Sequence, residues 1–428
     1  MKLTSSGELL IKKRPFPQWL TLYIFFMPFL LGFLQGFLKF PSIIKYTIDL
    51  AWIIVTICIF VRKSLSFKKR LIPFLVFVVT FFLVTFVVYL FNYETFLYYF
   101  WGVRNNFRFY FAFFAFCIFL SKEDAEDCLK FIDVAFWIDI FVCLYQFFVQ
   151  GYKQDYLGGI FGVEKGCNSY TITFFAIVVA KSLLSFMNKQ EKFGLCAAKC
   201  AVVLLISAMA ELKAFFLIFV LILLLSTIFT AYSWRKFGLI LVSVFIFSFA
   251  STFITSIFGS GSEITFKRMM ELVTAENYAS EDDLGRFTAI PMISSMFLTT
   301  LPLKLFGMGL GNCDTSSFEV FNTSFYQVNS ELHYNWFSSA FLFLETGYVG
   351  IVIFLSFFVM CFFYARRMKK RGESELLYCQ MAMILSIVSV VLMFYNPSLR
   401  SEIAYLVYFV FALPFIAVSE ETHERLTI

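Results

Sequence analysis

The reactive side chains of this sequence are concentrated in one polar stretch, residues 259–336. It contains Arg286, the glycine-rich run Gly307–Gly311 and His333, which is one of only two histidines in the chain. A fixed arginine suits a phosphate or diphosphate, because its guanidinium can engage two oxygens at once. A neutral imidazole suits the removal of a proton from a hydroxyl near pH 7. A sugar linked to a lipid through a diphosphate would use both groups, since the diphosphate is its leaving group.

The elements that must position these residues are membrane-spanning helices. Hydrophobic residues make up 60% of the chain, charged residues only 15%, and there are 63 phenylalanines. A soluble domain could not cover so much apolar surface with polar groups. Apolar segments of about 20 residues recur along the whole length, which is the length needed to cross a bilayer core. We therefore predict an all-α integral membrane protein with about 12 transmembrane helices, at 19–38, 43–61, 72–92, 103–120, 129–150, 168–187, 196–211, 214–231, 237–258, 338–365, 376–395 and 402–418.

Basic connectors fix the predicted orientation of these spans. The connectors Arg62–Arg70 and Arg366–Arg371 follow the second and tenth spans. The positive-inside rule places both on the cytoplasmic face, and the eight spans between them agree with that assignment. Both termini are then cytoplasmic, and the polar stretch is external. The predicted organisation is nine spans in 1–258, one large external loop in 259–337, and three spans in 338–428.

Two segments near the loop have a more detailed prediction. Residues Phe287–Leu305 read as helical and amphipathic, so we expect this part of the loop to fold against the membrane. The long tenth segment, 338–365, is expected to begin at the interface, with the span proper starting at about Tyr348.

Charged residues at membrane depth are costly and tend to face a cavity or a partner. On the predicted outer face, several cations lie at the ends of other spans. Those that could help bind an anion are Arg104, Arg108, Lys165, Lys213 and Arg400.

Four of these cations also have a simpler explanation. Arg104 and Arg108, four residues apart on one helix face, could extend to lipid headgroups. Lys213 could form only a helix-end ion pair with Glu211, and Arg400 could be a solvated turn residue. Both kinds of explanation stay open at the level of sequence.

Arg286 and His333 also have simpler explanations. Arg286 could pair with Asp282 or Asp283, and His333 could be an ordinary polar loop residue. The collective pattern, several external cations with one histidine, favours a site that binds an anionic group and performs base chemistry. The base could be His333 or the nearby Glu331.

Other motifs give no support for a cofactor, a metal or a nucleic acid. The run Gly307–Gly311 follows no predicted strand and lacks the third glycine of a dinucleotide fingerprint, so we interpret it as a tight backbone turn near the membrane surface. Cys196 and Cys200 have no histidine nearby and give no zinc signature. The net charge of +6 comes from basic residues clustered in short loops between spans, which does not indicate nucleic-acid binding.

The order of several motifs resembles that of a known family. Gly285-Arg286 is followed by Phe306–Gly311, then by His333–Asn335 and Glu345–Gly350, and then by a span. This order, strongest over 280–360, is similar to the O-antigen and capsule polysaccharide polymerase and O-antigen ligase superfamily (Wzy/WaaL-like). The layout of about 12 spans with one large external loop before the last three is similar as well.

The resemblance implies a cofactor-free, metal-independent glycosyltransferase in a bacterial inner (plasma) membrane. Its donor and acceptor would be glycans linked to a polyprenyl diphosphate such as undecaprenyl diphosphate, polymerised outside the membrane into O-antigen, capsule or exopolysaccharide. Arg286 would bind the diphosphate, with Arg104 or Lys213 contributing. His333 would orient or deprotonate the acceptor hydroxyl, and a single displacement would invert the anomeric centre. A flippase and a chain-length regulator would be possible partners besides the bilayer.

The chain departs from the family pattern at two places. The hairpin after the seventh span often carries an arginine in the family, whereas here it has Lys213, a point charge without the two-pronged geometry. Tyr334 separates His333 from Asn335, which favours a polymerase over a ligase. An O-antigen ligase or related oligosaccharyl transferase remains an alternative. A lipid-linked oligosaccharide flippase is another, although a transporter would place its charges near the midplane on broken helices.

Overall fold

The computed structural model describes residues 14–61, 69–92, 95–231, 284–316 and 318–418, together with Gly238 and two short strands. The strands, β1 (Lys2–Leu3) and β2 (Leu9–Leu10), pair antiparallel. Apart from Gly238, the predicted ninth span and the following residues to 283 lie outside the described residues. The longer described helices are α1 (Phe16–Gly32), α2 (Thr47–Val61), α3 (Ile72–Asn92), α4 (Phe96–Phe119), α5 (Lys122–Phe148), α6 (Asn168–Met187), α7 (Phe193–Met209), α8 (Lys213–Phe229), α14 (Ser338–Arg371), α15 (Leu376–Tyr395) and α16 (Ala404–Ile416).

An all-α membrane protein is the architecture that these helices form. Within the described residues, six helices are long and apolar enough to cross a membrane: those containing α1, α2, α3, α6, α14 and α15. Helices α7, α8 and α16 are apolar but shorter, and α4 and α5 do not reach the same standard. The predicted class is therefore confirmed, while the count of about 12 spans stays a prediction.

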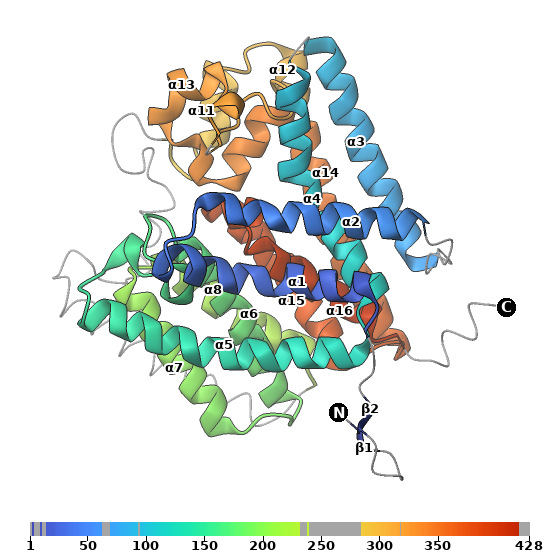
Figure 1. Ribbon diagram of the computed structural model, residues 1–428, viewed down its shortest axis with the longest axis vertical. Coiled ribbons are helices and arrows are strands. Elements are labelled where there is room, and N and C mark those ends of the chain that lie inside the picture. The colour runs from blue at the N-terminus through green and yellow to red at the C-terminus, as the bar shows by residue number, and fades with distance from the viewer. Residues whose placement is uncertain are drawn as a thin grey trace.

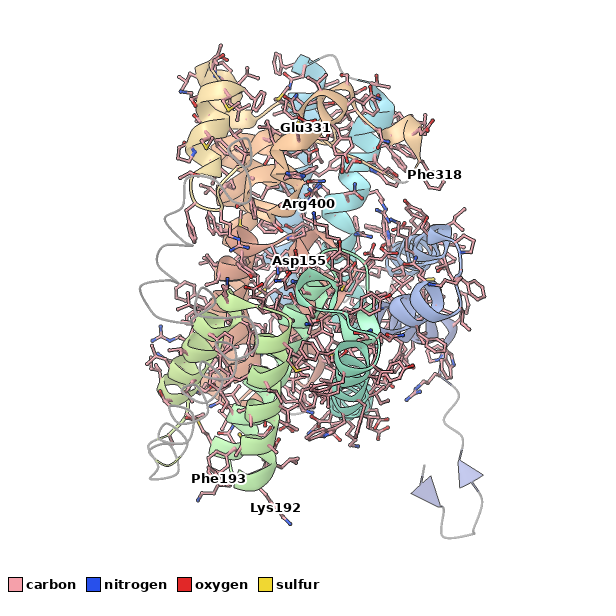
Figure 2. All side chains as sticks on the ribbon, turned by 90° about the vertical axis from the view of Figure 1, so that its left-hand side faces the viewer. Asp155, Lys192, Phe193, Phe318, Glu331 and Arg400 are labelled. Carbon is pink, nitrogen blue, oxygen red and sulfur yellow. The ribbon has the colours of Figure 1, made fainter. Side chains whose placement is uncertain are left out.

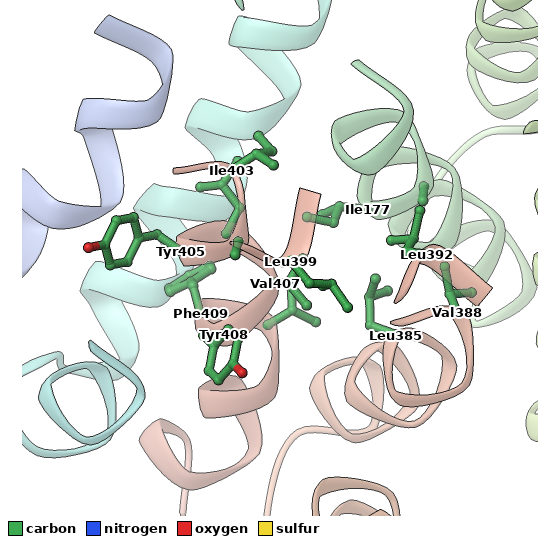
Figure 3. Packing of buried hydrophobic residues seen from close by; sticks show 14 of the residues in the cluster. Ile177, Leu385, Val388, Leu392, Leu399, Ile403, Tyr405, Val407, Tyr408 and Phe409 are labelled. Carbon is green, nitrogen blue, oxygen red and sulfur yellow. The ribbon is translucent and has the colours of Figure 1, made fainter. Parts of the chain in front are cut away.

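The core of the bundle lies around α16, whose residues are all buried. Helices α4 and α15 pack on it, and α6 packs on α15. Figure 3 shows Val407 and Phe409 of α16 in one apolar cluster with Leu385 and Val388 of α15 and Ile177 of α6. Helices α2 and α3 are peripheral and carry many exposed apolar side chains, at Leu50, Ile53, Ile57, Phe60, Val76, Val79, Leu83, Val87 and Phe91.

Segments predicted to be cytoplasmic contact one another. Arg14, just before α1, pairs with Asp124 at the start of α5 at 2.9 Å, and Arg70 before α3 pairs with Glu373 between α14 and α15 at 3.0 Å. Helix α5 begins there because Ser121 and Asp124 form a capping box, which satisfies backbone amides at the helix start. One end of the bundle therefore gathers turns that are far apart in the sequence.

The described part of the predicted external loop, from residue 284 onward, lies at the other end (Figure 1). Its short helices α11 (Ala289–Met296), α12 (Leu301–Phe306) and α13 (Ser324–Asn329) gather there beside one end of α4. Helices α11 and α12 confirm that Phe287–Leu305 is helical, but as two pieces. Figure 2 shows Glu331 in the upper part of the molecule, Arg400 and Asp155 further toward the middle, and Lys192 and Phe193 at the opposite end.

Helix α14 is broken at Gly347, which has φ 60° and ψ −162° inside the helical run. This is where the sequence placed the change from an interfacial segment to a span. A side chain could not be accommodated there, because a Cβ on Gly347 would lie 2.5 Å from the carbonyl carbon of Leu305. The first half of α14 therefore ends against the end of α12.

The glycine run Gly307–Gly311 satisfies the carbonyls that this break leaves open. Met308 N donates to Leu344 O at 2.9 Å, and Gly309 N donates to Glu345 O at 3.0 Å. Gly311 N donates to the buried Oε1 of Glu345 at 2.9 Å. The last carbonyls of a helix have no partner within it, so this backbone turn acts as their cap. Gly307, Gly309 and Gly311 all have positive φ, as the predicted tight turn requires.

Candidate functional site

A cavity of about 690 Å³ lies where the predicted outer turns meet. Its wall is built from six parts of the chain that are distant in sequence. They are the end of α1 with the following turn to Lys45, the α5–α6 connection with the start of α6, the α7–α8 hairpin, Arg286, the segment before α14, and the α15–α16 turn. A composite site of this kind needs nearly the whole chain.

Three of the cations predicted from the sequence line this cavity: Arg286, Lys165 and Lys213. The guanidinium of Arg286 lies 4.2 Å from the ring centre of Tyr395, and the ammonium of Lys165 lies 5.2 Å from that of Trp336. Aromatic faces hold cations in this way without neutralising their charge. Arg286 and Lys213 are partly buried, whereas Lys165 is exposed at the rim.

The hairpin between α7 and α8 presents one anionic and one cationic side chain to the cavity, Glu211 and Lys213. Lys213 Nζ pairs with Glu211 Oε1 at 2.9 Å, as the simpler interpretation of the sequence expected. Glu211 has φ 54°, a left-handed conformation that is costly for a residue with a Cβ. The turn is held by hydrogen bonds from Glu211 N to Ala208 O at 3.1 Å and from Leu212 N to Ser207 O at 2.8 Å.

Arg104 is not a cavity-lining residue. Its guanidinium pairs with Asp49 of α2 at 2.5 Å and lies between two rings, 5.1 Å from the centre of Tyr46 and 4.8 Å from that of Trp101. A ring on the predicted external loop, Phe321, stacks on Trp101 at 4.1 Å. Arg104 therefore helps join this loop to α2 and α4, and its predicted contact with the substrate stays a prediction.

Arg108 and Arg400 also lie outside the cavity lining. Arg108 is only 2% exposed, pairs with Glu402 at 3.2 Å, and donates to the carbonyl oxygen of Arg400 at 3.0 Å. Arg400 lies 3.6 Å from Asp314 Oδ2 and 3.2 Å from the ring centre of Phe341. Both arginines therefore pair with carboxylates outside the cavity lining, and Arg108 holds Glu402, which does line the cavity.

Glu402 connects this support to the cavity, which it lines. Its Oε1 pairs with Arg108, and its Oε2 accepts a hydrogen bond from the Tyr170 hydroxyl at 2.6 Å. Burial alone would raise the pKa of this carboxyl, but the charge of Arg108 and the Tyr170 hydroxyl together lower the pKa to about 2. Glu402 is therefore a fixed anion and a poor base near neutral pH.

His333 and Glu331 do not line the cavity either. The imidazole of His333 stacks on the indole of Trp336 with ring centres 3.9 Å apart, and it is Trp336 that reaches the cavity wall. His333 has a left-handed backbone, φ 50°, between the short helices Ser330–Leu332 and Tyr334–Trp336. Glu331 is exposed. The indole of Trp336 thus lies between His333, the predicted base, and the cavity. Glu331, the alternative base, lies on the exterior.

The α5–α6 connection forms a wall that enters the bundle. Gln146 of α5 exchanges two hydrogen bonds with the backbone of Gly159, both 2.8 Å long, and Asp139 Oδ1 accepts from Ile160 N at 2.8 Å. Both side chains are fully or almost fully buried. Buried backbone groups need partners, so these α5 side chains take the place of water and fix the segment that leads to Lys165.

Two helices begin at the cavity. Residues at the starts of α6 and α8, among them Asn168 and Lys213, line it. The free amide groups at a helix N-terminus create a positive potential that favours anions. The cavity thus combines four cations (Lys45, Lys165, Lys213 and Arg286) with two helix starts.

Several cavity residues were missed by sequence reasoning. Lys45 lies close to the predicted outer end of the second span, 43–61, so a search of the connections between spans did not include it. Trp336 lies three residues after His333, in the same short polar segment, and its indole rather than the imidazole lines the cavity. Tyr170 carried no sequence signal, because its contact with Glu402 joins α6 to a turn 232 residues away.

No family model matches this chain, and no curated protein matches it.

Proposed function

We propose that this membrane protein polymerises polyprenyl-diphosphate-linked oligosaccharide repeat units into a surface polysaccharide. The reaction is an inverting, metal-independent glycosyl transfer on the outer face of a bacterial inner membrane, with both termini in the cytoplasm. The observation that carries the proposal is the cavity, in which Arg286, Lys213, Lys165 and Lys45 converge from four separate connections.

The proposed role of the cations is to bind the diphosphate of the donor. A diphosphate gains negative charge as the bond to the anomeric carbon breaks, and fixed cations stabilise that charge best when they are already in place. The guanidinium of Arg286 is partly buried and held against Tyr395, which meets this requirement. Lys213 and the start of α8 add a second source of positive potential.

The acceptor is a second lipid-linked glycan, whose sugar hydroxyl attacks the anomeric carbon of the donor. The aromatic wall formed by Trp336, Phe337 and Tyr395 supports this part of the proposal, because aromatic side chains combine a large apolar surface with a polar edge. In this arrangement His333 stacks on Trp336 and holds its plane.

A reconstituted reaction tests the proposal. Purified protein in lipid nanodiscs receives one synthetic polyprenyl-diphosphate repeat unit and no other acceptor. A ladder of longer lipid-linked glycans, with release of polyprenyl diphosphate, is the expected result. Product that appears only after a different acceptor is added would identify a ligase instead. Movement of the intact substrate across a liposome membrane without bond formation would identify a flippase and overturn the proposal.

A further inference from the structure

We infer that Glu211 is the carboxylate that accepts the proton of the attacking hydroxyl, and that the donor diphosphate frees it by taking over Lys213. This inference rests on the proposed function and names a catalytic residue within the same cavity. It replaces His333 and Glu331 as the base, since neither lines the cavity.

The carboxylates that line the cavity differ in their availability. Asp155 and Glu164 are exposed at the rim, and Asp155 accepts from Asn168 Nδ2 at 2.8 Å. Both oxygens of Glu402 are engaged, one by Arg108 and one by Tyr170. Glu211 is the remaining one, with a side chain 23% exposed.

The backbone of the hairpin supports the choice of Glu211. A non-glycine residue in the left-handed region is uncommon and strained, so the surrounding structure must hold it there. Here the hydrogen bonds of the α7–α8 hairpin do so, and the result is that Glu211 and Lys213 both reach the same cavity. A turn without this conformation at Glu211 would send its side chain elsewhere.

The ion pair supplies a mechanism that couples donor binding to base activation. Without substrate, the Glu211 carboxylate is held by the Lys213 ammonium at 2.9 Å. A bound diphosphate carries more charge than one carboxylate and competes for that ammonium. Glu211 is then available to hydrogen-bond the acceptor hydroxyl.

The chemical step balances as follows. The hydroxyl oxygen of the acceptor forms a bond to the anomeric carbon of the donor, and its proton passes to the Glu211 carboxylate. The bond from the anomeric carbon to the diphosphate oxygen breaks, and the electron pair leaves with polyprenyl diphosphate. Solvent then removes the proton from Glu211.

The test compares Glu211→Gln with two other glutamate-to-glutamine variants in the nanodisc reaction. Glu164→Gln removes one of the two carboxylates at the rim, and Glu319→Gln is a matched control in an exposed part of the predicted external loop. Glu211→Gln is expected to lower kcat by about 100-fold or more, which is the range for loss of a general base. Glu319→Gln should stay within about threefold of the unaltered protein. A large loss in Glu164→Gln with little change in Glu211→Gln overturns the inference.

A binding measurement separates a catalytic role from a structural one. In Glu211→Gln, Lys213 loses its carboxylate partner, so polyprenyl diphosphate should bind at least about threefold more tightly than to the unaltered protein. Weaker binding would mean that Glu211 only supports the hairpin. If Glu211→Gln does not fold, Glu211→Asp serves instead, with kcat lowered about tenfold and binding retained. If the unaltered protein makes no ladder, the proposed function fails first, and this outcome is distinct from failure of the assignment to Glu211.

Discussion

The side chain of Gln146 holds Gly159 by both backbone groups. Its Nε2 donates to the Gly159 carbonyl and its Oε1 accepts from the Gly159 amide, each at 2.8 Å. The two residues are 13 positions apart, and both are buried. Together with Asp139 and Ile160, this contact fixes the cavity wall that carries Lys165 without any contribution from Lys165 itself.

Gln146→Leu should therefore loosen this wall. Leucine has a similar size but leaves a buried N–H and a buried C=O without partners, at a cost of about 1–3 kcal/mol each. We expect a lower thermal unfolding midpoint and faster hydrogen exchange over residues 157–162. Gln150→Leu, an exposed glutamine on the same connection, is the matched control and should change neither. Unaltered exchange in Gln146→Leu would show that the contact does not hold the wall.

Gly347→Ala should disrupt the joint between α12 and α14. The new Cβ would lie 2.5 Å from the carbonyl carbon of Leu305, and φ at Gly347 is 60°. Gly372→Ala separates the two effects, because Gly372 has φ 63° and no atom within 4 Å of a Cβ. Gly372→Ala should lower the free energy of unfolding by about 1 kcal/mol, the cost of the left-handed backbone alone, whereas Gly347→Ala should lower it clearly more. The yield of monodisperse protein and its unfolding midpoint measure the difference, and equal losses would rule out the close approach.

Glu402→Gln should destabilise the protein near pH 7, by about 3 kcal/mol, because Arg108 is left buried without its charged partner. The pKa of Glu402 is lowered from 4.5 to about 2, so its contribution is complete above about pH 4.5 and is lost as the pH falls toward 2. The gap in unfolding midpoint between the two proteins should be constant from about pH 7 to pH 5 and narrow at about pH 3. A gap that narrows already between pH 7 and pH 5 would contradict the lowered pKa.

Arg286→Ala should abolish ladder formation, with a loss of about 100-fold or more in kcat/KM, because the leaving diphosphate loses its strongest preorganised partner. Arg286→Lys should recover only part of the activity, since an ammonium cannot engage two oxygens in a fork. Arg371→Ala, an exposed arginine at the end of α14, should leave the rate unchanged. Full activity in Arg286→Ala would show that Arg286 does not bind the diphosphate.

Cysteine labelling tests the predicted orientation. Nine of the ten native thiols are buried, including Cys313 in the predicted external loop, so they should react slowly and give a low background. Val328 is 79% exposed, so the thiol of a Val328→Cys variant should react with a membrane-impermeant maleimide added to intact cells. Lys370→Cys should react only after the membrane is opened. The reverse pattern would invert the predicted topology.

Much of the helical frame was predictable, because long apolar segments have few alternatives in a membrane. The sequence also placed the start of the tenth span at about Tyr348, next to Gly347, but it did not predict the break in the helix itself. The function of the glycine run as a cap for Leu344 and Glu345 was not, because a backbone cap leaves no trace in side-chain type. The sequence predicted only a tight backbone turn at Gly307–Gly311.

The candidate site was predictable in composition but not in arrangement. Arg286 and Arg108 look alike in sequence, yet Arg108 is paired with Glu402, which is 294 residues away, and so is withdrawn from the cavity. Sequence alone could not show this pairing, since it depends on how α4 packs on α16. For the same reason His333 looked like a base, whereas its position depends on its stacking against Trp336.

The contact between the glycine run Gly307–Gly311 and the broken helix α14 has a consequence for how the protein is made. Chain synthesis delivers α4 first, so Gly311 can pack on Gly102 as soon as the loop emerges. The amides of Met308 and Gly309 must wait for their acceptors at positions 344 and 345, which are synthesised later. The cavity, whose lining runs from Pro28 to Glu402, is therefore completed only at the end of biogenesis. A chain stalled during insertion would hold its cations apart and remain inactive.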